Sequence, residues 1–163
     1  MTNSSTWRVA RISIFAALAV VGSFIKTPGS FGPISSVAFD SFAGFFVALY
    51  FGAFDGAVVA GLGHLATATV SGFPLGYLHL PIALGMALAG ASIGLVNSQT
   101  RAWTMIPALA CGVAINTAFV FVVVPSMGWG AAIAYMPVIF IAAALNALIA
   151  ALAYTGLRGK FRK

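Results

Sequence analysis

Long apolar segments follow one another along almost the whole chain, and very few charges interrupt them. Of the 163 residues, 61% are hydrophobic and 6% are charged. A soluble domain is about half apolar and about one quarter charged. A helix that crosses a bilayer requires about 20 mostly apolar residues. We therefore predict an all-α integral membrane protein.

Six apolar segments are long enough, or nearly so, to cross a membrane as helices. They cover residues 9–25, 39–54, 56–70, 78–96, 102–124 and 132–157. The second and third segments are short and meet at the turn GAFDGA, where Asp55 and Gly56 supply turn and cap chemistry. Lys26, rather than a small-residue cleavage site, follows the first segment, so we expect an uncleaved helix instead of a signal peptide. We expect residues 1–163 to form a single integral membrane domain.

The positive charges predict how the chain is oriented, because cytoplasmic loops carry an excess of Lys and Arg. With six spans, Lys26 alone lies on the side opposite the termini. We therefore predict a multi-pass protein of a prokaryotic cell membrane with both termini in the cytoplasm. Because the charges lie at helix ends and form no basic face on a soluble surface, we predict no binding to nucleic acid. The cations on the terminal side are Arg8, Arg11, Arg101, Arg158, Lys160, Arg162 and Lys163.

The two carboxylates of the chain, Asp40 and Asp55, flank one of the short apolar segments. Fourteen residues lie between them, which corresponds to about 20 Å along a helix. We expect them to cap opposite ends of one short helix, with Asp55 at the cytoplasmic turn and Asp40 at the outer mouth near Lys26. Capping is the favoured interpretation for Asp55. For Asp40, capping or pairing with Lys26 and contact with a ligand both stay open.

Three outward connections are rich in Gly, Pro, Ser and aromatic residues, namely KTPGSFGPISSV, SGFPLGY and PSMGWGAA. Such segments favour turns and lids over helices. Non-helical backbone at membrane depth is tolerated only where protein or a water-filled cavity surrounds it. We therefore expect an outward-facing pocket that these loops close.

Polar side chains inside apolar spans are costly and indicate functional positions, although a hydrogen bond between helices is the competing interpretation. Asn116 both donates and accepts hydrogen bonds, as recognition of a ring amide or a sugar hydroxyl requires, and both interpretations stay open for it. Asn146 lies deeper, where a contact between helices is favoured. His79, beside Tyr77, is a better ligand candidate than His64, for which a hydrogen-bonded core histidine is the favoured interpretation.

Other kinds of site are excluded by what the chain lacks. Two histidines without an acid or cysteine at ligand spacing make a poor metal site, so we predict no metal. Cys111 is the only cysteine, which excludes an intrachain disulfide. The chain has no Walker motif, no nucleophile beside a base and no paired carboxylates, so we predict neither an enzyme nor a cofactor. Phe31, Trp129 and Tyr135 lie at loop or interface height and together are candidates to stack on a flat ring.

The pattern D…G…FGAFDGAVVAGLGHL…GFPLG…H, together with six short spans, resembles the S component of an energy-coupling factor (ECF) transporter. The resemblance covers nearly the whole chain, and its most specific part runs from Asp40 through the fourth segment. It implies a small membrane protein that binds a vitamin or cofactor precursor from outside. It also implies partners, namely a T subunit and two ATPase subunits, which supply the energy for uptake.

The resemblance further implies a docking face and a substrate region. Family members dock through small residues, typically Ala-x-x-x-Ala, in the first helix, and the nearest matches here are Ser13 with Ala17 and Ala19 with Ser23. The substrate region lies between the outer loops and the outer halves of the later helices. Further candidates for contact with the substrate, in an outer loop or deeper in the spans, are Phe31, His64 and Asn146. By position the substrate region holds Lys26, Asp40, Tyr77, His79, Asn116, Trp129 and Tyr135.

The stretch GHLATATVSGFPLGYLH is most similar to S components assigned to cobalamin precursors, α-ribazole in particular. The few charges and several aromatic residues of the candidate region favour a flat heterocycle that bears hydroxyls. Riboflavin, pantothenate or a queuosine precursor are alternative substrates. A stand-alone facilitator or a structural membrane protein are the alternatives from other classes.

Overall fold

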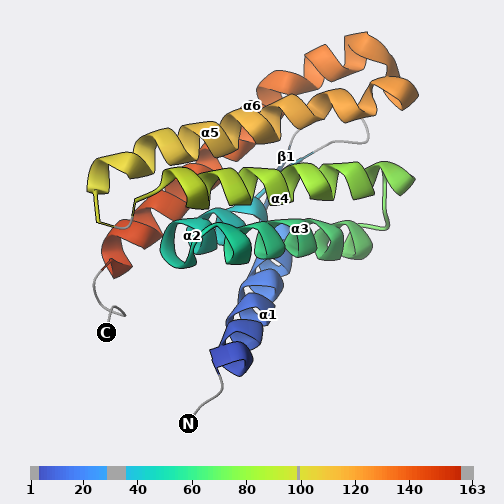
Figure 1. Cartoon of the computed structure of the whole chain (residues 1–163). Coiled ribbons are helices and arrows are strands. Elements are labelled where there is room, and N and C mark those ends of the chain that lie inside the picture. The colour runs from blue at the N-terminus through green and yellow to red at the C-terminus, as the bar shows by residue number, and fades with distance from the viewer. Residues whose placement is uncertain (1–3, 29–35, 99, 159–163) are drawn as a thin grey trace.

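The computed structural model describes residues 4–28, 36–98 and 100–158, and these residues form a helical bundle (Figure 1). Short 3-10 turns cover Gly76–Leu78, Ala102–Thr104 and Phe119–Val123, next to the α-helices. Strands β1 (Lys26–Pro28) and β2 (Ser36–Ala38) pair antiparallel, with Lys26 opposite Ala38. The α-helices are α1 (Ser4–Ser23), α2 (Ser41–Phe51), α3 (Ala53–Val70), α4 (His79–Val96), α5 (Met105–Ala118) and α6 (Val124–Leu157).

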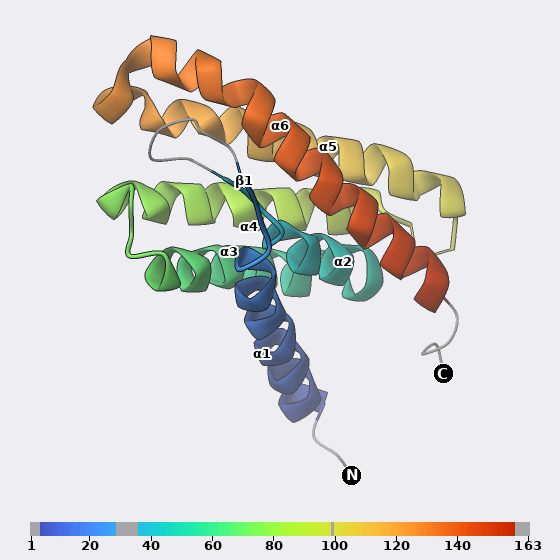
Figure 2. The same ribbon diagram turned by 180° about the vertical axis from the view of Figure 1, so that it is seen from behind.

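Helices α3, α4 and α5 lie side by side and alternate in direction, while α6 crosses behind them and α1 meets them at a steep angle (Figures 1 and 2). At one end of the bundle, the side chain of Asn97 after α4 donates to Leu49 O in α2 at 3.0 Å, and Tyr50 of α2 donates to Leu157 O of α6 at 3.3 Å. We call this the terminal end, because α1 begins and α6 ends there. The opposite end, with residues 71–78 and 119–130, is the loop end.

Small residues bring α2, α3 and α4 into close contact. A Cβ atom added at Gly44 would lie 2.7 Å from the Cβ of Ala60, and one at Gly90 would lie 2.5 Å from the carbonyl oxygen of Gly56. Gly56 in turn lies against Ala48. Such contacts allow helix backbones to approach where lipid provides no hydrophobic drive. They also set the register, since Gly44 beside Ala60 and Ala48 beside Gly56 place the start of α2 at the level of His64.

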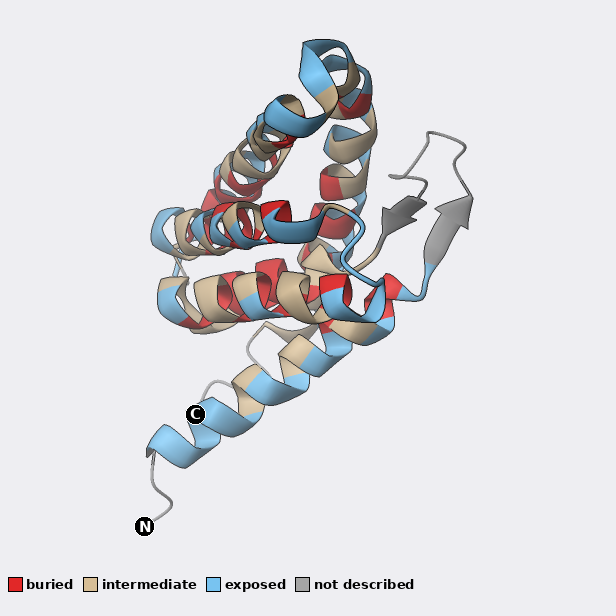
Figure 3. Cartoon of the chain, turned by 90° about the vertical axis from the view of Figure 1, so that its right-hand side faces the viewer, coloured by how far each residue is buried: buried red, intermediate tan, exposed pale blue. Residues whose placement is uncertain are grey.

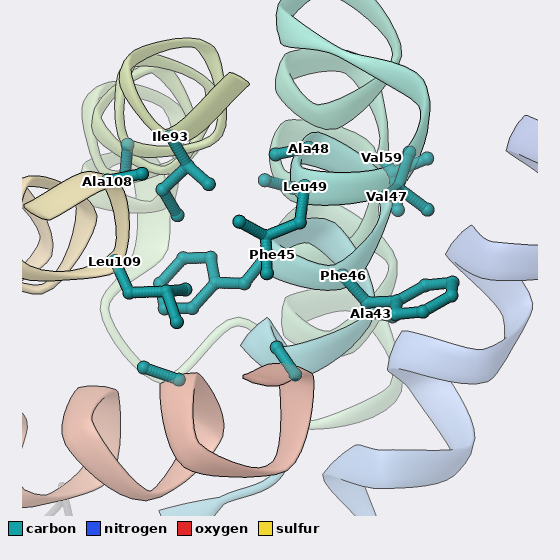
Figure 4. Close-up of a cluster of buried hydrophobic side chains, with 14 of the residues drawn as sticks. Ala43, Phe45, Phe46, Val47, Ala48, Leu49, Val59, Ile93, Ala108 and Leu109 are labelled. Atoms are coloured by element: carbon teal, nitrogen blue, oxygen red, sulfur yellow. The ribbon is translucent and has the colours of Figure 1, made fainter. Parts of the chain in front are cut away.

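The core is centred on α2, whose side chains reach in two directions (Figure 4). Phe45 and Leu49 are fully buried and point toward Leu109 of α5. Phe46 points to the other side, where its ring lies 5.4 Å from that of Phe15 in α1. Helix α2 therefore packs against α5 on one side and α1 on the other.

Most of α1 projects from the bundle, and its surface is largely exposed (Figure 3). One face contacts the other helices, and its apolar contacts include Phe15 and the buried residue Ala19. A Cβ atom added at Gly63 of α3 would lie 2.8 Å from the Cβ of Ala19. We call the contact of Ala19 with Gly63 the α1–α3 seam.

The helices occur where the apolar segments predict them, but the junction of the second and third lies elsewhere. Helix α2 ends at Phe51, and Gly52 makes the turn with φ 97° before α3 begins at Ala53. Glycine adopts this left-handed conformation without a steric penalty. Asp55 therefore lies inside the first turn of α3, and the prediction that it caps a helix is wrong.

Two of the predicted loops contain regular structure. Residues 125–131 were expected in an outer loop, but they belong to α6, in which only Gly128 departs from helical geometry with φ 78°. Pro125 occupies the first turn of this helix, where a missing N–H costs nothing. The first outer connection forms the β1–β2 ribbon at both its ends.

By length and composition, four helical stretches of the described residues are able to cross a membrane. They are Ser5–Ser23, Ala53–Val70, Gly76–Val96 and Ala102–Leu157. The last of these contains both α5 and α6. Helix α2 has 11 residues, which span about 16 Å, roughly half the thickness of the hydrocarbon core. Six α-helices in the described residues agree with the predicted order, and the count of six spans stays a prediction.

Candidate functional site

At the loop end, His64 and His79 meet across the α3–α4 interface. His64 Nε2 lies 3.1 Å from His79 Nδ1, and the peptide N–H of Leu75 donates to His79 Nε2 at 3.3 Å. The rings of Phe73 and His79 are nearly perpendicular, with centroids 5.5 Å apart. Phe73 itself has φ 50°, which is uncommon for a residue with a side chain. The connection between α3 and α4 is thus bound to His79 by both backbone and ring.

These contacts determine the protonation pattern of the pair. Because His79 Nε2 accepts from Leu75, its proton is on Nδ1. His79 Nδ1–H then donates to His64 Nε2, so the proton of His64 is on Nδ1. That N–H makes no hydrogen bond to any described residue. The structure therefore brings together the two histidines that the sequence treats separately.

The start of α2 is a second polar position, at the level of His64. Asn146 of α6 is buried, and its Oδ1 accepts from the peptide N–H of Phe42 at 2.8 Å. Its Nδ2 donates to Ala142 O at 2.9 Å. Asp40 precedes the helix and accepts from the hydroxyl of Ser41 at 3.1 Å, without a side-chain bond to the helix backbone. Asn146 thus joins two helices, in agreement with the interpretation favoured from its depth.

Asn116 differs from these residues. It lies on α5 near the middle of the bundle, is half-buried, and makes no side-chain hydrogen bond to any described residue. Thr67 of α3 has a buried hydroxyl that makes no hydrogen bond to the described residues. Sequence reasoning missed Thr67 and Phe73, since neither residue type marks a site without knowledge of its neighbours.

The remaining candidates are dispersed over the loop end. Tyr77 is exposed and follows the connection bound to His79. Trp129 is also exposed, and its ring centroid lies 5.8 Å from that of Phe121. Tyr135 is buried within α6. Lys26 lies on β1 across from Ala38, and Phe31 lies outside the described residues.

At the terminal end, Asp55 is fully buried and receives two guanidinium groups from α1. Arg8 Nε donates to one carboxylate oxygen at 2.5 Å, and Arg11 Nε donates to the other at 2.8 Å. A second nitrogen of Arg11 contacts the same oxygen. The N-terminus of α3 also favours the negative charge. We call Asp55, Arg8 and Arg11 the Asp55 cluster. These ion pairs, and not a capping role, explain why an acid is retained in an apolar helix.

Two aromatic rings cover the Asp55 cluster. The guanidinium of Arg8 lies 4.4 Å from the ring centroid of Phe54, and that of Arg11 lies 4.5 Å from the centroid of Phe51. Cations over ring faces are attracted by the ring quadrupole. The side chains of Arg8 and Arg11 nevertheless remain 47% and 35% exposed, so two partly hydrated cations share one carboxylate.

The predicted docking residues lie on opposite faces of α1. Ala19 and Ser23 are buried inside the molecule, and Ala19 belongs to the α1–α3 seam. Ser13 and Ala17 are exposed, beside the exposed apolar side chains of Ile14 and others. Only the Ser13 and Ala17 pair is therefore accessible to another protein.

Comparison with known proteins agrees with this architecture. No curated protein matches the chain significantly, and neither does any solved structure. A family model described as "ECF transporter, substrate-specific component" matches residues 8–158. Since the match extends from the first arginine of the Asp55 cluster to the end of α6, the chain belongs to the family of substrate-specific components of ECF transporters.

Proposed function

We propose that this protein is the solute-binding subunit of an ECF importer and takes up a cofactor precursor. It binds its solute at the loop end and docks on a T subunit driven by two ATPase subunits. Family membership over residues 8–158 carries the proposal. The membrane orientation that follows places the loop end outside and both termini in the cytoplasm.

The distribution of polar groups supports binding at the loop half of the bundle. At the terminal end, Asp55 is bound by two arginines, and Asn97 donates to Leu49 O and accepts from Thr104 at 3.2 Å. Toward the loop end, His64 Nδ1 and the amide of Asn116 are available to a ligand. A facilitator requires a polar path through both halves of the membrane, and the internal pairing at the terminal end disfavours that alternative.

We propose α-ribazole or a related cobalamin precursor as the solute. Its flat base suits the aromatic residues Trp129 and Tyr135, and its ribose hydroxyls suit hydrogen bonds from His64 and Asn116. Riboflavin, pantothenate and a queuosine precursor share a heterocycle or hydroxyls and are the alternatives to test beside it.

Thermal unfolding of the purified protein with each compound tests the substrate. A ligand at 100 times its dissociation constant stabilises the folded state by about 2.7 kcal/mol. We expect a rise in Tm with α-ribazole, a smaller rise in the Asn116→Ala variant, and an undiminished rise in Thr155→Val at the terminal end. If Tm rises with another compound of the panel and not with α-ribazole, that compound is the solute.

Uptake into cells tests the mechanism. We expect uptake of the stabilising compound to require the T subunit and both ATPase subunits. Uptake that persists after deletion of these subunits contradicts the proposal and favours a facilitator. A protein that is folded, yet neither binds nor transports any compound, favours a structural role.

A further inference from the structure

The Asp55 cluster raises a question that solute binding does not answer, because it lies at the end of the bundle opposite the candidate site. It contains the one fully buried carboxylate of the described residues and both cations of α1. Arg8 and Arg11 continue the core-facing side of α1, one to two turns before Phe15. The cluster thus attaches the first part of α1 to the start of α3.

This attachment matters because the first part of α1 has little else to hold it. Residues 5–10 are all exposed, and the apolar contacts of α1 with the core come from Ile12, Phe15 and later residues. From Arg8 to Ala19 the helix extends about 16 Å. Helix α1 is therefore held at two places: the Asp55 cluster near its beginning, and the packing of Ile12 and Phe15 together with the α1–α3 seam along the rest of the helix.

Between these two places, Ser13 and Ala17 face away from the bundle. Close packing of small residues against a partner helix requires a defined helix orientation, because the contact depends on backbones that approach within a narrow range. A helix attached at one end alone pivots about that end and presents the pair in many orientations.

We propose that Asp55, bound by Arg8 and Arg11, is a positioning residue that orients α1 so that Ser13 and Ala17 face the coupling subunit. The inference rests on the proposed function for its partner. It requires that loss of the Asp55 cluster impairs uptake while solute binding at the other end of the bundle persists.

The experiment measures three quantities for each variant: the ligand-induced rise in Tm, uptake with the complete transporter, and the distance between spin labels at Thr6→Cys and Thr100→Cys in a Cys111→Ser background. In Asp55→Asn, we expect an unchanged rise in Tm, uptake reduced about tenfold, and a broader distance distribution. Arg101→Gln removes an exposed cation outside the cluster and serves as the matched control, with all three quantities unchanged.

A variant with exchanged charges distinguishes an effect on the orientation of α1 from an effect on folding. Arg11→Asp combined with Asp55→Arg again places one carboxylate between two guanidinium groups, so we expect uptake and the narrow distance distribution to return. Where Asp55→Asn does not fold, Arg8→Gln and Arg11→Gln are added to it, so that no charge of the Asp55 cluster is left without its partner.

Three outcomes overturn the inference: uptake that is normal in Asp55→Asn, a distance distribution that does not broaden, or failure of both Asp55→Asn and the triple variant to fold. If the unaltered protein itself lacks ligand binding and coupled uptake, the proposed function fails. The spin-label distances then still decide whether the cluster orients α1.

Discussion

At the residue scale, the same amino acid type has different roles according to whether its hydrogen bonds are made within the chain. Asn146 uses both ends of its amide inside the bundle, to Phe42 N and to Ala142 O. Asn116 makes no side-chain hydrogen bond to the described residues. From the sequence, depth in the apolar segment favours a contact between helices for Asn146 and leaves both interpretations open for Asn116. Only the position of Phe42, 104 residues away, identifies the partner of Asn146.

We expect Asn146→Ala to lower the free energy of unfolding by about 1–3 kcal/mol, because the peptide N–H of Phe42 loses its acceptor in a buried place. Asn116→Ala leaves no protein group without a partner and is expected to change stability by less than about 0.5 kcal/mol. Chemical unfolding of both variants in detergent measures the difference. Equal losses of stability in the two variants contradict this assignment of roles.

The role of Asp55 could not be predicted from its neighbours in the sequence. An Asp-Gly pair between apolar segments indicates a turn or a cap, and Gly52 supplies the turn instead. What decides the role of Asp55 is its ion pairs with Arg8 and Arg11, which lie 47 and 44 residues away. Charge counts place all three at one end of the bundle, but no local pattern indicates that they meet.

At the element scale, the sequence predicts the helices and misplaces their ends. Segment length and apolar content are local properties, so the six α-helices of the described residues lie where expected. The sequence predicts a loop over residues 125–131 because Pro, Ser and Gly favour turns. In the structure Pro125 begins a helix, and the hydroxyl of Ser126 donates to Val123 O at 3.0 Å. Pro125 and Ser126 are compatible with the start of a helix as well as with a turn. The contacts of α6 with the rest of the bundle decide in favour of the helix.

Close packing of α3 with α4 makes a prediction about glycine. In Gly90→Ala, the added methyl group lies 2.5 Å from Gly56 O unless the helices separate. We expect a loss of about 1–3 kcal/mol in the free energy of unfolding. Gly130→Ala in α6 is the matched control, since no atom lies within 4 Å of the added methyl group. Its stability is expected to stay unchanged or to rise by up to about 1 kcal/mol, and a destabilisation as large as that of Gly90→Ala contradicts this explanation.

At the scale of the whole molecule, the two ends of the bundle differ in kind. Of the described residues, Arg8, Arg11, Arg101 and Arg158 all belong to the terminal end, where polar groups pair with one another. The loop end has the β1–β2 ribbon, the connection bound to His79, and the kink at Gly128. The proposed function assigns the contact with cytoplasmic partners to the terminal end and the binding of the ligand to the loop end.

The same asymmetry predicts the orientation in the membrane, because Lys and Arg accumulate on the cytoplasmic side. In a Cys111→Ser background, Gly130→Cys at the loop end is expected to react with a membrane-impermeant thiol reagent in intact cells. Thr155→Cys at the terminal end is expected to react only after the cells are opened. Both positions are exposed in the structure, so a difference between them reports the side of the membrane and not burial within the protein. The opposite pattern of labelling would show that the loop end faces the cytoplasm, and this result contradicts binding of an external solute there.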